Sequence, residues 1–229
     1  MATRAVIPFR TIRPRLFEGL APAEIKMIVS AAKERRYLAN SVILNQEHPA
    51  DQFFLLISGR ARLFYLTPDG RKVILLWLPP GEIFGTAALL SGPSKYLVST
   101  EAVKRSSVLV WDRATIRTLT ARYPCLINNV LLVMFDVLVA HRALHVSMIC
   151  DSARQRLAQV LAHLVTGMGQ KVPGGIELDV RNEELANAAN VTPFTASRLL
   201  SAWQRQGVLT KKRGKVLLRS PERLFREDV

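Results

Sequence analysis

The most informative segment of this chain is NEELANAANVTPFTASRLLSAWQRQGVLTKKRGKVLLR, residues 182–219. It predicts two helices joined by a tight turn and followed by a short hairpin. Asn182 is suited to cap the first helix, and Asn190 to end it in the left-handed conformation. Thr192 is suited to cap the second helix, with Pro193 at its first position, where a missing N–H costs no hydrogen bond. This pattern is typical of a winged helix-turn-helix, a unit that holds duplex DNA.

The second predicted helix separates its residues onto two sides at spacings of three and four. One side is apolar and carries Ala196, Leu199, Leu200 and Trp203. The opposite side carries Phe194, Ser197, Arg198, Ser201 and Arg205. Hydroxyls, arginines and one aromatic ring near a helix N-terminus suit the major groove of DNA. We therefore interpret this helix as the recognition helix.

The predicted hairpin after this helix is strongly basic. From Arg198 to Arg219 the chain has seven lysines and arginines and no Asp or Glu. Cations around the Gly214 turn would lie over phosphates and add salt-dependent affinity. A merely solvated surface helix and loop is disfavoured, because caps, turn, exposed side and basic hairpin all agree. The predicted DNA contacts are Thr192, Phe194, Thr195, Ser197, Arg198, Ser201, Arg205, Lys211, Lys212, Arg213 and Lys215.

The composition favours a polyanionic partner. The chain has 229 residues, of which 49% are hydrophobic, and a formal net charge of +14. This length is enough for one large or two ordinary domains, and this apolar content supports a packed core. On charge alone, nucleic acid and an acidic membrane surface are both candidate partners.

We expect neither a secretory signal nor a membrane span. Residues 1–16 lack an apolar core, so no signal peptide is predicted. The most apolar run, Val130–Ala140, is too short to cross a bilayer and contains Asp136. The two cysteines, Cys125 and Cys150, are too few for a disulfide framework. The chain is therefore expected to be cytoplasmic, with no membrane partner.

The first half of the chain predicts an antiparallel β-barrel or sandwich. Turn signals at residues 58–59, 68–70 and 79–81 separate short apolar or alternating runs. Many short strands with regular turns are typical of that architecture. The predicted strands are Val42–Leu44, Gln52–Ile57, Ala61–Leu66, Val73–Leu78, Leu97–Thr100 and Ser107–Val110.

A helical pattern returns at about Asp112. It predicts a short helix over Arg113–Arg122, a long helix from about Cys125 to Met148, and a further helix over Ser152–Thr166. The long helix has apolar residues at alternating spacings of three and four, which is a coiled-coil seam. Other sides of it are apolar too, so we expect it to pack on a twin helix and on its own β-domain. The predicted dimer seam is Val130, Met134, Val137, His141, Leu144 and Met148.

This order of parts resembles the cyclic-AMP receptor protein and FNR superfamily of bacterial transcription regulators. The segment FFLLISGRARLFYLTPDGRKVILLWLPPGEIFG, residues 53–85, and the helix-turn-helix carry the resemblance, which covers nearly the whole chain. The resemblance implies an α+β fold: an N-terminal cyclic-nucleotide-binding-type β-roll (a jelly roll), a long dimerisation helix and a C-terminal winged helix-turn-helix. The implied domains are residues 1–123 for an effector, 124–150 for dimerisation and 151–229 for DNA. The implied partners are a near-palindromic operator, a second copy of the chain and RNA polymerase.

Two departures from this family concern the effector site. Relatives that bind cyclic AMP have a glutamate shortly after the position of Gly85, where this chain has Thr86. They also have an Arg-Ser pair further on, where this chain reads SKYLVS, residues 94–99, with no arginine. Lys95 offers a charge but not the bidentate fork that an arginine offers a phosphate. Cyclic AMP is therefore disfavoured, and the effector stays unknown. The candidate effector-pocket residues are Gly85, Thr86, Ala87, Lys95, Tyr96, Leu97, His141 and Arg142.

The cofactor is left unknown. FNR-type oxygen sensing needs an N-terminal cysteine cluster, and residues 1–40 contain no cysteine, so no iron–sulfur cluster is expected. His141 and His145 are four residues apart on the long helix and are candidates to share haem or a metal. A seam histidine bonded across the dimer is favoured instead, because two histidines without a nearby carboxylate or thiol are weak evidence. We expect no metal site.

A third departure lies in the recognition helix. Many relatives carry a glutamate that reads cytosine shortly before a Ser-Arg pair. Ser197 and Arg198 match that pair, but Phe194 stands at the glutamate position. Arg198 is expected to reach a guanine, and Phe194 is a candidate to pack on a thymine methyl. The alternative for Phe194 is core packing against the preceding helix.

These observations predict a DNA-binding transcription regulator that acts as a homodimer, with DNA affinity controlled by an effector at the pocket between β-roll and dimer helix. One alternative is a regulator that responds to a cyclic nucleotide. Another is a constitutive DNA binder whose β-roll interior is filled by its own side chains, with Tyr96 or Arg142 as candidates. An enzyme is not supported, because the chain has no phosphate-binding loop, no His-Glu metalloprotease motif and no G-x-S-x-G turn.

Overall fold

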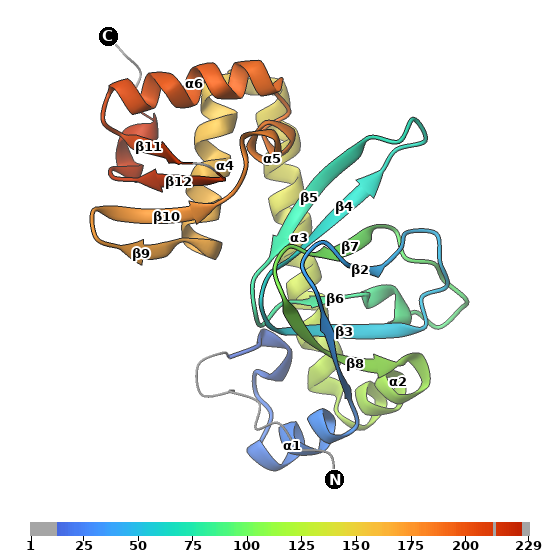
Figure 1. Ribbon diagram of the computed structural model, residues 1–229. Helices are drawn as coiled ribbons and strands as arrows, with labels where there is room; N and C mark the ends of the chain where they lie inside the picture. The colour runs from blue at the N-terminus through green and yellow to red at the C-terminus, as the bar shows by residue number, and fades with distance from the viewer. Residues whose placement is uncertain (1–12, 213, 226–229) are drawn as a thin grey trace. The chain divides into compact units, whose positions relative to one another are not determined.

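The computed structural model describes residues 13–212 and 214–225. The chain divides into two compact units, Met1–Leu138 and Val139–Val229, which we describe one at a time (Figure 1). One long helix, α3 (Pro124–Cys150), contributes to both. The predicted fold class is confirmed: a β-roll, a long helix and a C-terminal helix-turn-helix with a small sheet.

The first unit contains two four-stranded sheets in which every described pairing is antiparallel. One sheet has the order β1-β8-β3-β6, with bounds Lys33–Tyr37, Ser106–Asp112, Gln52–Ser58 and Ile83–Phe84. The other has the order β2-β7-β4-β5, with bounds Val42–Leu44, Ser99–Ala102, Ala61–Leu66 and Lys72–Leu78.

Strand β3 has a core on both of its faces, which explains its almost continuous apolar sequence. Phe54 and Leu56 belong to the cluster that joins side chains of the two sheets, and the ring of Phe54 stacks on that of Phe84 with centroids 4.8 Å apart. Phe53 and Leu55 belong to a second cluster, which includes residues of the helices. Burying a Phe or Leu side chain stabilises a fold by about 1.5–3 kcal/mol, so this strand anchors the unit.

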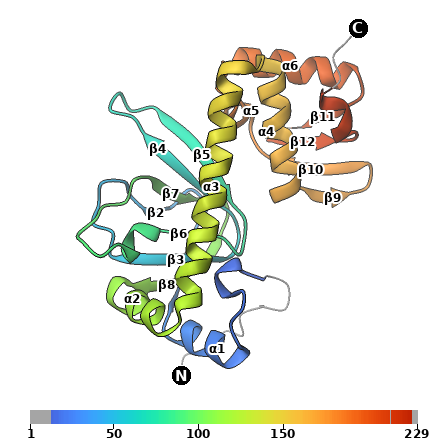
Figure 2. The same cartoon turned by 180° about the vertical axis from the view of Figure 1, so that it is seen from behind.

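The helices of the first unit cover the outer face of the β3 sheet. They are η1 (Arg15–Phe17), α1 (Pro22–Ser30), η2 (Thr86–Leu89), α2 (Arg113–Arg122) and the first part of α3. The first part of α3 runs along this unit (Figure 2). Its Leu126, Val130 and Val133 are buried in the same core as Phe53 and Leu55. Asn129 Nδ2 donates hydrogen bonds to the carbonyl oxygens of Leu16 and Glu18 at 3.0 and 2.8 Å. This side of α3 is therefore fixed to its own β-roll.

The second unit places two helices against a third, beside a small sheet. After α3 come α4 (Ala153–Met168), α5 (Asn182–Ala188) and α6 (Pro193–Arg205), and η3 (Pro221–Phe225) follows the sheet. The sheet has the order β11-β12-β10-β9, with bounds Leu209–Lys212, Lys215–Leu218, Gly175–Asp179 and Gln170–Val172. Leu157 and Leu161 of α4, Leu185 of α5, and Leu200 and Trp203 of α6 are completely buried.

Most predicted elements of regular structure are confirmed, with local corrections. The predicted strand Leu97–Thr100 is wrong at its start, because the strand is β7, Ser99–Ala102. Strand β1 (KERRY) was not predicted, since it is an edge strand whose first four side chains are exposed and so carry no apolar alternation. The predicted cap of α5 is also wrong: Asn182 is the first helical residue, and the cap is Arg181.

Candidate nucleic-acid interface and effector site

Helix α6 begins as its sequence predicts. Thr192 Oγ1 accepts a hydrogen bond from the backbone N–H of Thr195 at 3.1 Å, and Pro193 occupies the first turn. Asn190 ends the preceding turn with φ of 49°, and Gly207 follows α6 with φ of 71°. These caps fix both ends of the helix without help from distant residues.

Helix α6 buries one side and exposes the other. Ala196, Leu200 and Trp203 are completely buried. Arg198 and Arg205 are exposed, and within the part of the chain that the structure describes neither makes an ion pair. Phe194 is 77% exposed, so the core-packing alternative for this residue is wrong. The exposed side thus offers two guanidinium groups and one aromatic ring.

Ser201 and Lys211, both predicted DNA contacts, are bonded to each other. Ser201 Oγ accepts a hydrogen bond from Lys211 Nζ at 2.9 Å and donates one to the carbonyl oxygen of Ser197 at 2.8 Å. The Lys211 backbone N–H also donates to Gln204 Oε1 at 3.0 Å. These bonds tie strand β11 to α6, so the two residues hold the hairpin in place beside the helix.

Two lysines of the hairpin share one carboxylate. Glu177 on β10 accepts a hydrogen bond from Lys215 Nζ at 2.5 Å, and Lys212 Nζ lies 3.8 Å from its other oxygen. The bond from Lys215 holds the pKa of Glu177 below its ordinary value, so this carboxylate is ionised at neutral pH. Arg213, the predicted contact between these lysines, lies outside the described residues. If Lys212 and Lys215 contact DNA phosphates, Glu177 competes with those phosphates for the two lysines.

We expect Glu177→Gln to strengthen DNA binding by about two- to fivefold at low salt, because it removes one negative charge and releases two lysines. The measurement is fluorescence anisotropy with a duplex of unrelated sequence at two salt concentrations. Glu222→Gln is the matched control, since Glu222 is exposed on η3 and has no ion pair among residues 13–212 and 214–225. Equal affinities for Glu177→Gln and wild type would contradict the competition.

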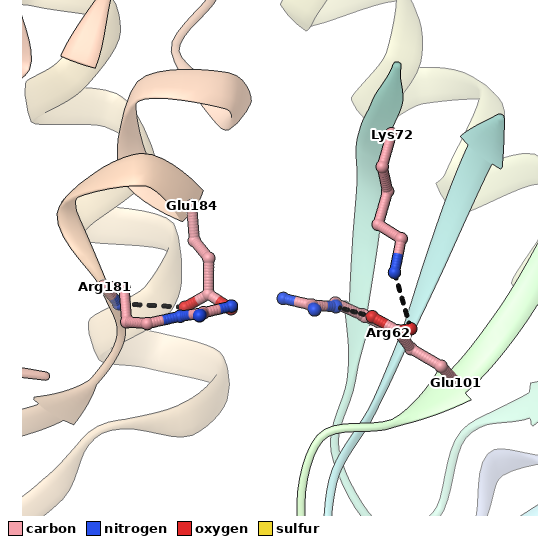
Figure 3. A network of polar contacts seen from close by, with 5 residues as sticks. All are labelled: Arg62, Lys72, Glu101, Arg181 and Glu184. Carbon is pink, nitrogen blue, oxygen red and sulfur yellow. Dashed lines mark hydrogen bonds and ion pairs between the residues drawn. The ribbon is translucent and has the colours of Figure 1, made fainter. Parts of the chain in front are cut away.

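Arginines set the geometry between α5 and its neighbours. The backbone N–H of Arg181 donates to Glu184 Oε2 at 2.8 Å, and its guanidinium lies 3.3 Å from Oε1 of the same residue (Figure 3). Arg156 of α4 donates from Nε to the carbonyl oxygen of Ala189 at 2.9 Å, and from its terminal nitrogen to that of Asn190 at 3.3 Å. Sequence reasoning missed this role of Arg156, because Ala189 and Asn190 lie more than thirty positions away from it.

The candidate effector residues start at a glycine that cannot be replaced without strain. Gly85 has φ of 72°, and a Cβ built there would lie 2.8 Å from the ring of Phe54 and 2.9 Å from the carbonyl oxygen of Gln52. Thr86 follows it, and its hydroxyl lies 3.6 Å from the sulfur of Met134 on α3. Ala87 is half-buried beside the core that contains Phe54.

Tyr96 fills part of the β-roll interior. Its side chain is 6% exposed and belongs to the cluster of Phe54 and Phe84. Its hydroxyl donates to the carbonyl oxygen of Gln52 at 2.8 Å and accepts from the backbone N–H of Gln52 at 2.9 Å. Burial raises the pKa of this phenol above its ordinary value, so it is neutral and able to make both bonds at physiological pH.

The structure separates Tyr96 from its two neighbours in the predicted pocket. Lys95 is exposed and its Nζ lies 3.4 Å from a carboxylate oxygen of Glu47, while Leu97 is 78% exposed. Lys95 and Leu97 therefore do not share the interior position of Tyr96, and their contact with an effector stays a prediction. Successive side chains of an extended segment point to opposite sides, so an inward Tyr96 turns both neighbours outward.

His141 and Arg142 lie exposed on the part of α3 that belongs to the second unit, together with His145. Residues 13–212 and 214–225 contain no cluster of three His, Cys, Asp or Glu side chains suited to a metal. The structure thus adds no ligand to the His141 and His145 pair.

Helix α3 exposes an apolar stripe that differs from the predicted seam. Val130 is 4% exposed and lies in the core of its own unit, and Met134 packs against that core, so the prediction of Val130 as a seam residue is wrong. Of the other predicted residues, Val137 and Leu144 are half-buried, and His141 and Met148 are exposed. The exposed α3 stripe consists of Leu131, Phe135, Leu138, Val146 and Ile149, which are 61, 62, 65, 51 and 74% exposed.

Helix α3, at 27 residues, is also long and apolar enough to cross a membrane. No other helix in the described part of the chain is. A single such helix is weak evidence of a span, and Leu126, Val130 and Val133 are already buried against the β-roll.

A buried ion network crosses three strands of the β-roll. Arg62 on β4 donates to Glu101 Oε1 on β7, and Lys72 Nζ on β5 lies 2.7 Å from Glu101 Oε2 (Figure 3). The side chains of Arg62 and Glu101 are only 7 and 6% exposed. Burial raises the pKa of Glu101, but the bonds and charges of Lys72 and Arg62 outweigh it, and the net pKa lies below the ordinary value.

We expect Glu101→Gln to lower the free energy of unfolding by about 3–5 kcal/mol at neutral pH, because Arg62 stays buried without this counter-charge. The pKa of Glu101 is lower in the folded than in the unfolded protein. The contribution of Glu101 to the free energy of unfolding is therefore complete above about pH 5, and it is lost as the pH falls through the pKa of the folded protein. The measurement is urea denaturation between pH 3 and pH 8. Glu47→Gln, at an exposed pair, should change stability by less than about 1 kcal/mol.

Comparisons with known proteins agree with this architecture. A model of the cyclic nucleotide-binding domain matches residues 34–123, and one of the Crp-like helix-turn-helix domain matches residues 155–227. The chain is 30% identical to the cyclic AMP receptor protein of Thermus thermophilus, over 89% of this chain and 92% of that protein. It is 22% identical to the CRP-like cAMP-activated global transcriptional regulator of Mycobacterium tuberculosis, over 93 and 96%. The structure of the c-di-GMP responsive regulator CLP of Xanthomonas campestris has the same fold, with a TM-score of 0.76 and 19% identity over 86% of this chain and 99% of that one.

Proposed function

Because this chain belongs to the CRP/FNR superfamily of transcription regulators, we propose that it acts as a homodimer that places one α6 in each of two successive major grooves of a near-palindromic operator. Proteins of this family bind DNA through the helix-turn-helix and are regulators, not enzymes. The observation that carries the proposal is the exposed side of α6, where Arg198 and Arg205 have no ion pair among the described residues. Two recognition helices must lie about 34 Å apart to meet successive grooves.

The DNA contacts divide by chemistry. Arg198, near the start of α6, suits the bidentate pair with a guanine edge, and Ser197 and Phe194 suit neighbouring positions. Thr192 and Thr195 at the helix N-terminus suit a phosphate, as do Arg205, Lys212 and Lys215. Ser201 and Lys211 act through each other, as positioning residues, because their polar groups are already bonded. Arg213 completes the proposed phosphate contacts.

A second copy of the chain covers the exposed α3 stripe. Leu131, Phe135 and Leu138 follow one another at spacings of four and three, the pattern with which two helices interlock. Because the opposite side of α3 is buried in its own β-roll, this stripe is the side that remains for a twin helix. We assign residues 124–150 to dimerisation, 1–123 to effector control and 151–229 to DNA binding.

We further propose that an effector other than cyclic AMP controls DNA affinity from the β-roll and the adjoining α3. The support is Thr86, where relatives that bind cyclic AMP have a glutamate, and the segment of residues 94–99, which has no arginine and whose Tyr96 is buried and bonded internally. An effector needs a coupling free energy of only about 1–3 kcal/mol between its site and the DNA to act as a switch. The name of the Thermus thermophilus relative favours cyclic AMP as the alternative.

A second candidate is constitutive DNA binding with no effector. The observation in its favour is Tyr96, whose ring and hydroxyl occupy the β-roll interior. In this case the β-roll serves as a dimer scaffold and as a docking surface for RNA polymerase. Strand β1 suits such a role, because Lys33, Arg35 and Arg36 are exposed on it. Either candidate places the protein in the cytoplasm, where its DNA and RNA polymerase are.

The test combines native mass spectrometry with an absorption spectrum of protein purified from its own host. We expect a mass of twice the 25.6 kDa chain, together with enrichment of one near-palindrome from a randomised duplex library. A bound small molecule or haem band supports effector control, and an empty dimer that binds tightly supports the constitutive candidate. Cyclic AMP should cause no thermal shift. A monomer that enriches no sequence would overturn the proposal.

A further inference from the structure

The most exposed large apolar side chain in the described part of the second unit is Phe194, at 77%. Outside α3, the only other exposed large apolar residue there is Phe225, at 51%. The remaining large apolar residues of α6 point the other way: Leu200 and Trp203 are completely buried and Leu199 is half-buried. Phe194 therefore faces outward while the core of the unit is complete without it.

The local structure fixes where Phe194 points. The cap from Thr192 to the Thr195 N–H at 3.1 Å and the 2.9 Å bond between the two hydroxyls hold the first turn, and Pro193 restricts the backbone beside it. Phe194 precedes Arg198 by four residues, so both lie on one side of the helix, about 6 Å apart along its axis. Base pairs rise about 3.4 Å, so the two side chains meet bases within about two steps of each other.

The chemistry of the major groove leaves one group for Phe194 to contact. Every base edge there presents hydrogen-bond donors or acceptors, and the single apolar group is the C5-methyl of thymine. A phenyl ring placed against guanine, adenine or cytosine removes water from polar groups and offers no hydrogen bond in return. Against the methyl it buries apolar surface on both sides. Phosphates are no alternative, because the ring has no donor.

We propose that Phe194 selects thymine in each operator half-site by packing on its C5-methyl group, an inference that rests on the DNA-binding function proposed above. The recognised group is the methyl, not the pairing face of the base. Cytosine lacks it and 5-methylcytosine has it at the same place in the groove. Phe194 therefore distinguishes methylated from unmethylated cytosine at this position, and thymine from uracil.

The test uses duplexes of the sequence enriched from a randomised library, with the candidate position changed in both half-sites to thymine, uracil, 5-methylcytosine or cytosine. Uracil differs from thymine by the methyl alone, and 5-methylcytosine differs from cytosine by the same methyl. Burial of one methyl corresponds to about fourfold in affinity, hence about fifteenfold for two half-sites. We expect this loss from thymine to uracil, and a similar gain from cytosine to 5-methylcytosine.

The matched variants are Phe194→Ala and Phe194→Leu. The first should bind thymine and uracil duplexes equally, and the second should keep a reduced methyl preference because it keeps an apolar group. Since Phe194 is 77% exposed, both should fold, which circular dichroism checks. A methyl preference that survives in Phe194→Ala, or wild-type binding that ignores the methyl at every thymine, overturns the inference while the DNA-binding function stands. A library that yields no enriched sequence overturns both.

Discussion

Leu138→Asp is expected to leave the protein monomeric and to weaken binding of a two-half-site operator by about 10²- to 10⁴-fold, because each recognition helix then binds alone. Leu138 is 65% exposed at the middle of the exposed α3 stripe, with Phe135 and Leu131 in the preceding turns. Burying a carboxylate between two apolar helices costs several kcal/mol of desolvation. Analytical ultracentrifugation gives the mass, and anisotropy with full and half operators gives the affinity.

Two further variants make this test specific for the side of the helix. Ala140→Glu changes an exposed residue nine positions after Leu131, about two and a half turns and so on the opposite side, and should stay dimeric. His141→Glu changes an exposed residue of the seam that the sequence predicted, and should weaken the dimer less than Leu138→Asp does. If the His141→Glu variant were monomeric and the Leu138→Asp variant dimeric, the two helices would meet along the seam predicted from the sequence and not along the exposed α3 stripe.

Helix α3 shows why its seam was not predictable from sequence. It is apolar on nearly every side, so a repeat of three and four can be drawn through Val130 and Met134 or equally through Leu131 and Phe135. Only the tertiary structure decides between them, because Leu126, Val130 and Val133 are taken up by the core of the first unit. Periodicity identifies a helix with two buried sides, but it does not say which side belongs to which neighbour.

The ends of helix α6, in contrast, were predictable, because the residues that set them lie close by in the sequence. The cap at Thr192, the proline after it and the left-handed Asn190 act within a few residues, and all were predicted. The ties that hold the DNA-facing parts together were missed, among them Arg156 to Ala189 and Glu177 to Lys215. Those pairs are 33 and 38 positions apart and join ordinary surface residue types, so nothing in the sequence pattern marks them.

The effector site lies between these cases. The sequence showed that Thr86 stands where relatives have a glutamate and that residues 94–99 contain no arginine. Tyr96 satisfies its hydroxyl on the backbone of Gln52, and this inward placement turns Lys95 to solvent. The sequence alone could not show that Tyr96 points inward and is bonded to the backbone of Gln52. Only the hydrogen-bond partners and the burial of Tyr96 show it.

The second large effect is expected from Arg198→Ala, which should lower affinity for the enriched operator by about a thousandfold while leaving binding to unrelated DNA nearly unchanged. A bidentate arginine–guanine pair contributes about 1–3 kcal/mol of discrimination, and a homodimer makes it twice. Arg198→Lys should lose most of the same preference, because an ammonium group keeps the charge but not the planar fork.

Arg205→Ala is the matched control on the same exposed side of α6. If Arg205 contacts a phosphate, its loss should weaken specific and unrelated DNA alike and lower the slope of log affinity against log salt by about one per half-site. Arg198→Ala should instead change the ratio between the two DNAs with little effect on the slope. Equal losses on both DNAs for Arg198→Ala would place it on the phosphates. Base recognition would then depend on Phe194 and Ser197. Comparing the slopes of log affinity against log salt for Arg198→Ala and Arg205→Ala therefore decides which side chains of α6 read the operator.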